Sequence, residues 1–351
     1  MFVSRPFQDL FGSIRSAVRL RTRIRSIAYR ISPPGPKPLI LTYHRVADEP
    51  VDPCGIFVSP SHFEEQLCVL RRTRHVFSLV DFVAHFFNGT LPANAVALTF
   101  DDGYVDNLIA GKPRLAHADV PATVFLATGY LDRPEPFWWD ELAHLVLLGK
   151  NPQHFELVFR DKSIKIDFGP ELPTDEGEVT TVGPATKRLD AFWTIWKAMR
   201  RLQDEERRST MITLRSIFRE RDECNNLGRA MTSEEVRALV TDGLVTIGAH
   251  TVTHPVLAGL EVAACRREIT ESKLTCEALV GAPVVAFAYP YGDFDTAACE
   301  AVKAAGLSFA CSTQPTPVVP TSDHLALPRV YAPNLGGDAF EEFLGLASAR
   351  R

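Results

Sequence analysis

The sequence of 351 residues lacks the usual marks of membrane-spanning, secreted or nucleic-acid-binding proteins. It contains no apolar run of the roughly 20 residues that cross a bilayer, and its N-terminus lacks the apolar core of a secretory signal. Basic residues are in the minority, with 38 Lys and Arg against 43 Asp and Glu. That balance argues against a surface built to bind phosphate backbones. We therefore expect a cytoplasmic protein with no nucleic-acid partner.

The seven cysteines show no paired spacing. Their number is odd, they are scattered from Cys54 to Cys311, and no Cys-x-x-Cys occurs. This pattern excludes a disulfide framework and a thiolate metal site, and it fits reduced thiols in the cytoplasm. The sequence also has no internal repeat and no low-complexity segment, and its 46% hydrophobic content is typical of a globular protein.

Residues 1–36 form a distinct basic segment that ends in the proline-rich run Pro33–Pro36. Asp9 is its single acid, against seven arginines. These are Arg5, Arg15, Arg19, Arg21, Arg23, Arg25 and Arg30. Apolar residues recur between them at helical spacing, and a basic amphipathic helix can lie on an anionic membrane surface. We expect residues 1–30 to make peripheral contact with the inner face of the membrane. The alternatives are a solvated helix packed on the protein and a disordered arm.

From residue 37 onward, short apolar strands alternate with helices of about a dozen residues, which is typical of a parallel α/β sheet or barrel. The expected strands are 38–44, 75–79, 95–100, 121–127, 244–249, 284–289, 307–312 and 327–331. We expect helices to start after Ser59 or Ser61 and after a capping box at Thr232 or Ser233. A further helix is expected over about 107–117 and another over 262–280. The main domain spans 37–335, and 336–351 form a C-terminal helix or tail.

Residues 130–230 interrupt this alternation and are predicted to be a large mixed insertion that caps or borders the active-site mouth. Residues 155–168 alternate like a hairpin, and a charged helical stretch is expected from Lys187 to about Glu223. Trp138 and Trp139 open an aromatic-rich helix. They are suited either to stacking on a sugar face or to the core of the insertion.

Polar residues with the chemistry of a metal site follow three of the expected strands. Asp101 and Asp102 end one strand, His250 ends another with His254 four residues later, and Tyr291 follows a third. The carboxyl ends of parallel barrel strands form one face, and two histidines with one carboxylate leave open positions on a divalent metal. A second carboxylate can then take a proton from a metal-activated water. The alternatives are an ordinary Asp-Gly turn and a pair of structural histidines.

Three segments resemble motifs of the polysaccharide deacetylases, the family-four carbohydrate esterases with the NodB-homology domain. They are Thr99–Gly103, His250–His254 and Phe287–Gly292. The resemblance covers residues 38–130 and 230–335. It implies a distorted (β/α)7 barrel, here with a large mixed insertion, and a metal-dependent hydrolase that removes N-acetyl groups from a sugar or polysaccharide such as a capsule or exopolysaccharide glycan.

By position, the resemblance also implies roles for individual residues. Asp101 matches the catalytic base, and Asp102, His250 and His254 match the metal ligands. Tyr291 matches the residue whose backbone N–H stabilises the oxyanion. Zn²⁺ is the expected metal, with Co²⁺, Ni²⁺ and Fe²⁺ as alternatives for this ligand set.

The sequence departs from the family pattern at two points. Ala288 stands where the third motif usually has the arginine that orients the base, and Arg329 is our candidate to replace it from another strand end. The C-terminal Leu-x-His motif is missing, and Tyr43-His44 resembles it at the front of the chain, as in the permuted branch that deacetylates poly-N-acetylglucosamine. His44 is therefore the candidate general acid. The alternative is that His44 only forms hydrogen bonds within the barrel.

Two other functions fit the same residues. One is a different amide hydrolysis, such as deformylation or deacetylation of a lipid-linked sugar, for which the basic N-terminal segment would suit a membrane-bound substrate. The other is a non-catalytic glycan-binding domain, although such a domain needs no base beside a metal.

Overall fold

The computed structural model describes residues 35–148, 154–159, 162–168, 187–218 and 228–350. Contacts divide the chain into Met1–Gly35 and a compact unit from Pro36 to Arg351. The expected basic helix of residues 1–30 lies outside the described residues. Among the helices that are described, none is both long and apolar enough to cross a bilayer.

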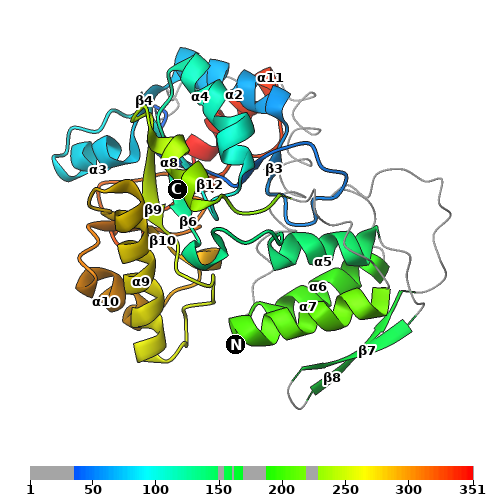
Figure 1. Cartoon of the computed structure of the whole chain (residues 1–351). Helices are drawn as coiled ribbons and strands as arrows, with labels where there is room; N and C mark the ends of the chain where they lie inside the picture. Colours follow the sequence, from blue (N-terminus) through cyan, green and yellow to red (C-terminus); the bar gives the residue numbers. More distant parts are fainter. Residues whose placement is uncertain (1–34, 149–153, 160–161, 169–186, 219–227, 351) are drawn as a thin grey trace. The chain divides into compact units, whose positions relative to one another are not determined.

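An eight-stranded parallel sheet forms the centre of the compact unit (Figure 1). Its order is β11-β10-β9-β6-β5-β1-β12, and β4 pairs with β5 beside this path. The strands are β1 (Leu39–Tyr43), β4 (His75–Phe77), β5 (Ala95–Phe100), β6 (Ala122–Leu126), β9 (Val245–Ala249), β10 (Ala286–Ala288), β11 (Phe309–Cys311) and β12 (Val330–Tyr331). Every residue of β1, β5 and β6 is buried, as expected for parallel strands covered on both faces.

One short segment near the C-terminus joins the two ends of this sheet. Leu327 forms a parallel bridge with Cys311 of β11, and three residues later Val330 pairs with Leu41 of β1. The seven strands of the main path therefore curl into a distorted barrel, which confirms the predicted α/β barrel fold.

Helices surround the barrel between its strands. They are α2 (Pro60–Thr73), α3 (Leu79–Phe87), α4 (Lys112–Ala118), α8 (Ser233–Val240), α9 (Val262–Val280), α10 (Thr296–Ala304) and α11 (Gly337–Ser348). The Ser59 hydroxyl caps α2, and Thr232 with Glu235 forms the predicted capping box of α8. The stretch expected as one helix over 107–117 begins instead with the π-helical turn η2 (Asn107–Gly111).

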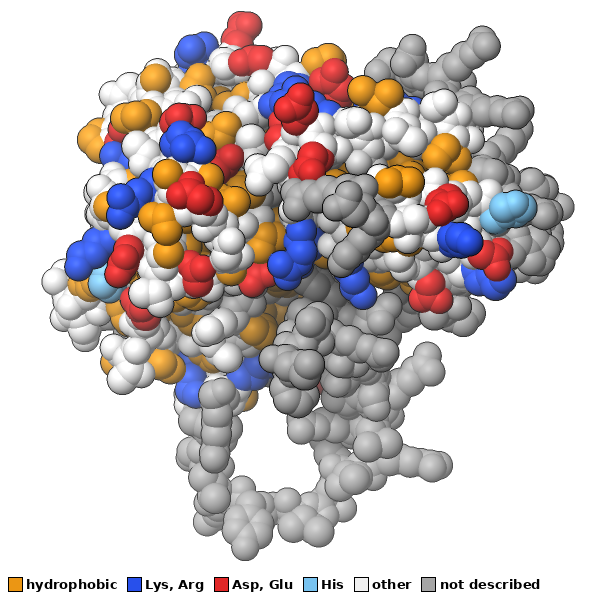
Figure 2. Space-filling view, turned by 90° about the horizontal axis from the view of Figure 1, so that it is seen from below, with side chains coloured by type: hydrophobic (Ala, Val, Ile, Leu, Met, Phe, Trp, Pro, Cys, Tyr) orange, Lys and Arg blue, Asp and Glu red, His pale blue; other side chains and the backbone are white. Residues whose placement is uncertain are grey.

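Several short elements lie in the loops of the barrel. Its loops contain the strand pair β2 (Arg45–Val46) and β3 (Phe57–Val58), and the 3₁₀ turns η3 (Thr128–Tyr130) and η5 (Pro290–Gly292). On the face drawn in Figure 2, acidic and basic side chains of the described residues are interspersed.

The insertion is a helical layer whose core continues into residues of the barrel such as Tyr104 and Ala127. It contains α5 (Trp138–Leu147), the antiparallel hairpin of β7 (His154–Phe159) and β8 (Lys162–Asp167), α6 (Lys187–Met199) and α7 (Asp204–Phe218), grouped together in Figure 1. Its core includes Leu142, Phe192 and Leu214, which are fully buried. The hairpin was predicted correctly. The helical stretch predicted from Lys187 is confirmed as the two helices α6 and α7 with a break between them, and Glu223 lies outside the described residues.

Candidate active site

The polar residues singled out in the sequence meet at one end of the barrel because β5, β6, β9 and β10 are neighbours in the sheet. Asp101 and Asp102 follow β5 directly, and His250 follows β9. The backbone ties these ends together: the His250 amide donates to the Leu126 carbonyl at 3.0 Å, and the Ala127 amide donates to the Asp102 carbonyl at 3.2 Å. Parallel strands thus deliver all three residues to the same edge.

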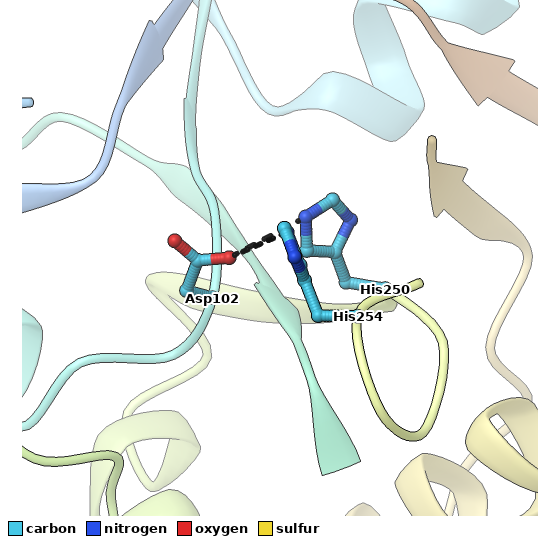
Figure 3. A group of neighbouring side chains, drawn as sticks. All are labelled: Asp102, His250 and His254. Atoms are coloured by element: carbon cyan, nitrogen blue, oxygen red, sulfur yellow. Dashed lines mark ion pairs between the residues drawn. The ribbon is translucent and has the colours of Figure 1, made fainter. Parts of the chain in front are cut away.

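Asp102, His250 and His254 form a buried group with the composition of a metal site. Their potential ligand atoms all lie within 4.8 Å of one another. The Asp102 Oδ1 atom is 3.5 Å from Nε2 of His250 and 3.3 Å from Nε2 of His254. Figure 3 shows both imidazole rings turned toward this carboxylate. Two histidines and one carboxylate around a common point suit a divalent cation with open positions.

The surroundings of this group fit a cation. Oδ1 of Asp102 is buried and accepts no hydrogen bond from any residue described, so a positive charge is needed to compensate it. Nδ1 of His250 lies 2.7 Å from the Ala288 carbonyl, which fixes the ring so that Nε2 faces Asp102. Burial lowers the pKa of His250, and it lowers that of His254 to about 3 with help from the Arg207 charge. Both rings are therefore neutral at pH 7, the form that binds metals.

Left-handed backbone is concentrated at this site. Of the six non-glycine residues with positive φ in the described part of the chain, four are Asp102 (φ 72°), Thr251 (φ 68°), His254 (φ 54°) and Tyr291 (φ 60°). Such conformations cost energy and persist only where neighbouring contacts impose them. The fold therefore imposes this conformation on the loops that carry the candidate ligands.

Asp101 is held by Arg329, which the sequence offered as a replacement for the missing motif arginine. Nη1 and Nη2 of Arg329 donate to Oδ1 and Oδ2 of Asp101, both at 2.7 Å. The guanidinium is fully buried and also donates to the Ser312 carbonyl at 3.0 Å and the Thr99 hydroxyl at 3.1 Å. Burial alone would raise the pKa of Asp101, but the Arg329 charge overrides it and holds that pKa well below its usual range. Asp101 is therefore ionised at neutral pH.

His44 lies near the two aspartates. Its ring stacks on that of Tyr331 with centroids 5.5 Å apart and planes 5° apart. Nδ1 of His44 is buried and has no hydrogen-bond partner among the described residues. Burial lowers the pKa of His44, while the charges of Asp102 and Asp101 act to raise it. The imidazole is thus available to a ligand and feels both carboxylates.

Tyr291 approaches the group from the turn after β10. Its ring centroid lies 4.5 Å from that of His254, edge to face. The next residue, Gly292, has φ 67°, and a Cβ there would lie 1.8 Å from Oγ1 of Thr313, so the turn requires glycine. No hydrogen bond from the Tyr291 amide to another described residue is found. This N–H is therefore free to donate to a ligand.

Sugar stacking by Trp138 and Trp139 does not fit the structure. Their side chains are 5% and 6% exposed and belong to the core of the insertion. Trp139 nevertheless contacts the site, because its ring centroid is 4.9 Å from that of His254. Its indole N–H donates to the Tyr104 hydroxyl at 2.7 Å, and that hydroxyl donates to Asp140 at 2.7 Å.

Arg207 and Glu268, which contact the loop between the two histidines, were missed from the sequence altogether. Neither belongs to a recognisable motif, and no local pattern distinguishes them from other charged residues on helices. Their position against the loop is visible only in the fold.

The chain matches the polysaccharide deacetylase family over residues 88–151 and 194–310. No curated protein matches it. Among solved structures it is similar to IcaB from Ammonifex degensii, with a TM-score of 0.54 and 17% identity over 90% of this chain and 98% of that one.

Two further solved structures are similar. The Streptococcus pyogenes deacetylase PplD in complex with acetate has a TM-score of 0.51 and 17% identity, covering 89% of this chain and 98% of that one. A polysaccharide deacetylase from Bacillus cereus has a TM-score of 0.53 and 18% identity, covering 90% of this chain and 70% of that one. At these identities the likeness shows the fold alone.

Proposed function

The chain belongs to the polysaccharide deacetylase family and is a deacetylase, and from this premise we propose that it hydrolyses the N-acetyl groups of a glycan with a divalent metal held by Asp102, His250 and His254. The observation that carries this proposal is the pairing of that three-residue group with Asp101. One aspartate of the adjacent pair faces the two histidines, and the other is fixed by Arg329. A glycan-binding module needs no catalytic base beside a metal site.

The ligand set favours Zn²⁺, with Co²⁺, Ni²⁺ and Fe²⁺ as alternatives. When bound, the ion polarises the acetamide carbonyl and lowers the pKa of a water molecule. The protein contributes neutral imidazoles at His250 and His254 and a carboxylate whose Oδ1 has no competing donor among the described residues. The Ala288 carbonyl keeps the His250 ring in its orientation.

Asp101 acts as the general base. It is ionised, and the two hydrogen bonds from Arg329 fix its orientation. In this role it takes a proton from the water that attacks the acetamide carbon. The Tyr291 amide donates to the oxygen on which negative charge develops, because a preorganised N–H is most effective at developing charge.

His44 delivers a proton to the nitrogen that leaves as the free amine, and acetate is the other product. Its buried Nδ1 without a partner and its closeness to both aspartates support this role. Because burial lowers the pKa of His44, the imidazole must be protonated within the catalytic cycle or at mildly acidic pH.

Deacetylation of a lipid-linked sugar stays the second candidate substrate class, because seven arginines lie within residues 1–30. The proposed contact of this segment with the inner face of the membrane, and the cytoplasmic location, rest on sequence alone. Co-sedimentation of the full chain with anionic vesicles, and its absence with neutral ones, tests the membrane contact.

The decisive test combines metal content with acetate release. The purified protein is stripped with a chelator, reloaded with Zn²⁺, Co²⁺, Ni²⁺ or Fe²⁺, and incubated with short N-acetylglucosamine oligomers. We expect acetate only from reloaded protein and none from Asp101→Asn loaded with the same metal. Acetate release by the metal-free protein would rule out the proposed chemistry.

A further inference from the structure

The loop between the two candidate histidine ligands is held by hydrogen bonds to every one of its carbonyls. The carbonyl of Thr251 accepts from the Thr128 amide at 3.0 Å, and that of Val252 accepts from the Gly129 amide at 2.7 Å. A Cβ at Gly129 would lie 2.6 Å from the Val252 oxygen, so only glycine permits this approach. These two contacts come from the barrel, through the turn η3.

Three amides of the same loop are also paired. Oε2 of Glu268 in α9 accepts from Val252 at 2.8 Å and Thr253 at 2.9 Å. The His254 amide donates to the Thr251 hydroxyl at 3.1 Å. The barrel, α9 and the loop itself thus supply all of these hydrogen bonds, which leaves the carbonyls of Thr253 and His254.

Those last two carbonyls are bound by Arg207, a residue of the insertion. Its Nη2 donates to the Thr253 oxygen at 2.6 Å, and its Nη1 donates to the His254 oxygen at 3.2 Å. The side chain is 1% exposed, and the nearest oxygen of Asp204 is 3.8 Å away. A buried guanidinium with only a distant carboxylate relies on these carbonyls to compensate its charge.

We propose that Arg207 is a positioning residue that couples the insertion to metal binding. His254 has φ 54°, a left-handed conformation that residues other than glycine rarely adopt unless contacts impose it. Arg207 imposes it by fixing the carbonyls on both sides of the Cα atom that carries the second imidazole. The helical layer α5–α7 is therefore part of the metal site rather than only a border around it. This inference rests on the metal site of the proposed function.

Metal affinity is the first test, because a merely structural arginine would change stability without changing affinity. Zn²⁺ binding is measured by competition with a chromogenic chelator for wild type, Arg207→Met and Arg207→Lys. We expect Arg207→Met to bind Zn²⁺ about 10- to 100-fold more weakly, the usual effect of removing a group that orients a ligand. Arg207→Lys should recover part of the loss, because an ammonium still donates to carbonyls.

The matched control is Arg74→Met. Arg74 also donates to a backbone carbonyl, but to that of Leu344 in α11, at 3.1 Å. It should leave Zn²⁺ affinity unchanged. If Arg207→Met binds Zn²⁺ within twofold of wild type while circular dichroism shows it folded, the proposal is overturned.

A second test needs no variant and decides the case if Arg207→Met fails to fold. Hydrogen exchange of the full wild-type chain is compared with saturating Zn²⁺ and with chelator. Coupling predicts that Zn²⁺ slows exchange of the α7 amides about tenfold or more, and those of α11 much less. Equal protection of the two helices, or none in α7, contradicts the proposal.

The two hypotheses fail in different ways. Wild-type protein that binds no metal refutes the proposed function, and this inference with it. Metal binding that depends on Arg207 in a protein that releases no acetate refutes only the proposed reaction. Metal binding and acetate release that are both indifferent to Arg207 refute only the coupling.

Discussion

Arg329 and Asp101 are 228 residues apart in the sequence and form a two-pronged ion pair in which both nitrogen–oxygen distances are 2.7 Å. Both side chains are buried, with exposed fractions of 0% and 4%. The fork geometry fixes the carboxylate plane, which a lysine ammonium cannot do. The pair thereby supplies an orienting cation for Asp101, the role for which the sequence offered Arg329 because position 288 is an alanine.

Arg329→Met should therefore raise the pKa of Asp101, since burial then acts without an opposing charge. Asp101 serves as a base only when ionised, so its depressed pKa keeps it active at acidic pH in the wild type. In the variant the acid limb of kcat/KM should move to higher pH. Stability should fall by about 3–5 kcal/mol, because the remaining carboxylate is buried without a partner. Arg329→Lys keeps the positive charge but loses the fork geometry. It should therefore return the acid limb of kcat/KM to the wild-type pH more fully than it restores the rate. An acid limb that stays in place in Arg329→Met would contradict the assigned role.

The adjacent aspartates provide a matched pair of variants. Asp101→Asn should retain metal and lose turnover, because it removes the base and leaves the ligand group intact. Asp102→Asn should lose both, because its Oδ1 faces the two imidazoles. Metal content by elemental analysis, measured beside acetate release, separates the two. Loss of metal from Asp101→Asn with retention by Asp102→Asn would reverse the assignment.

The metal-free protein should lose stability on acidification. The pKa of His254 is lowered to about 3 in the folded state by burial and by Arg207, whereas an unfolded histidine titrates near 6.5. Between these values the unfolded chain binds more protons, so the free energy of unfolding falls as pH falls. The slope approaches about 1.4 kcal/mol per pH unit for this one group. Urea unfolding in chelator from pH 7.5 to 5 measures it, with His254→Gln as the control. A variant whose unfolding is as pH-sensitive as wild type would exclude His254 as the source.

The sequence predicted the site's strand ends well because their signal is local. Mostly apolar, strand-length runs precede Asp101 and His250, and parallel strands bring the residues that follow them to one edge of the sheet. The placement of Arg329 against Asp101 does not follow from this logic, because Arg329 precedes β12 instead of following it, and its long side chain reaches the carboxylate.

What the sequence missed depends on contacts between distant elements. The sequence left Trp138 and Trp139 open between sugar stacking and the core of the insertion, and contacts outside their helix decide for the core. Trp138 packs against Trp196 of α6, and Trp139 packs against His254. In the sequence, Arg207 cannot be distinguished from an arginine on the surface of a helix. Its role becomes visible only in the packing of α7 against the loop between His250 and His254. The break before α7 did have a signal: Asp204 opens a run of three acids, which is typical of a helix start.

His44 offers the sharpest test of the proposed reaction, because a general acid matters only when the leaving group needs a proton. An amine leaving from an acetamide needs one, whereas a phenolate leaving from an activated aryl acetate does not. His44→Gln should thus lower kcat on N-acetylglucosamine oligomers by about 10²- to 10⁴-fold and change aryl acetate hydrolysis far less. Zn²⁺ affinity should stay at the wild-type value.

The pH profile adds an independent signature. Because burial lowers the pKa of His44, its protonated fraction declines at pH values below the ordinary histidine pKa of about 6.5. As pH rises, kcat for amide hydrolysis by the wild type should therefore begin to fall already below pH about 6.5, and His44→Gln should lack this alkaline limb. The matched control is His62→Gln, since His62 bonds Asn334 at the surface. Equal losses on the amide and the aryl ester would instead assign His44 to the structure of the barrel, because a group that only supports the site affects both substrates alike.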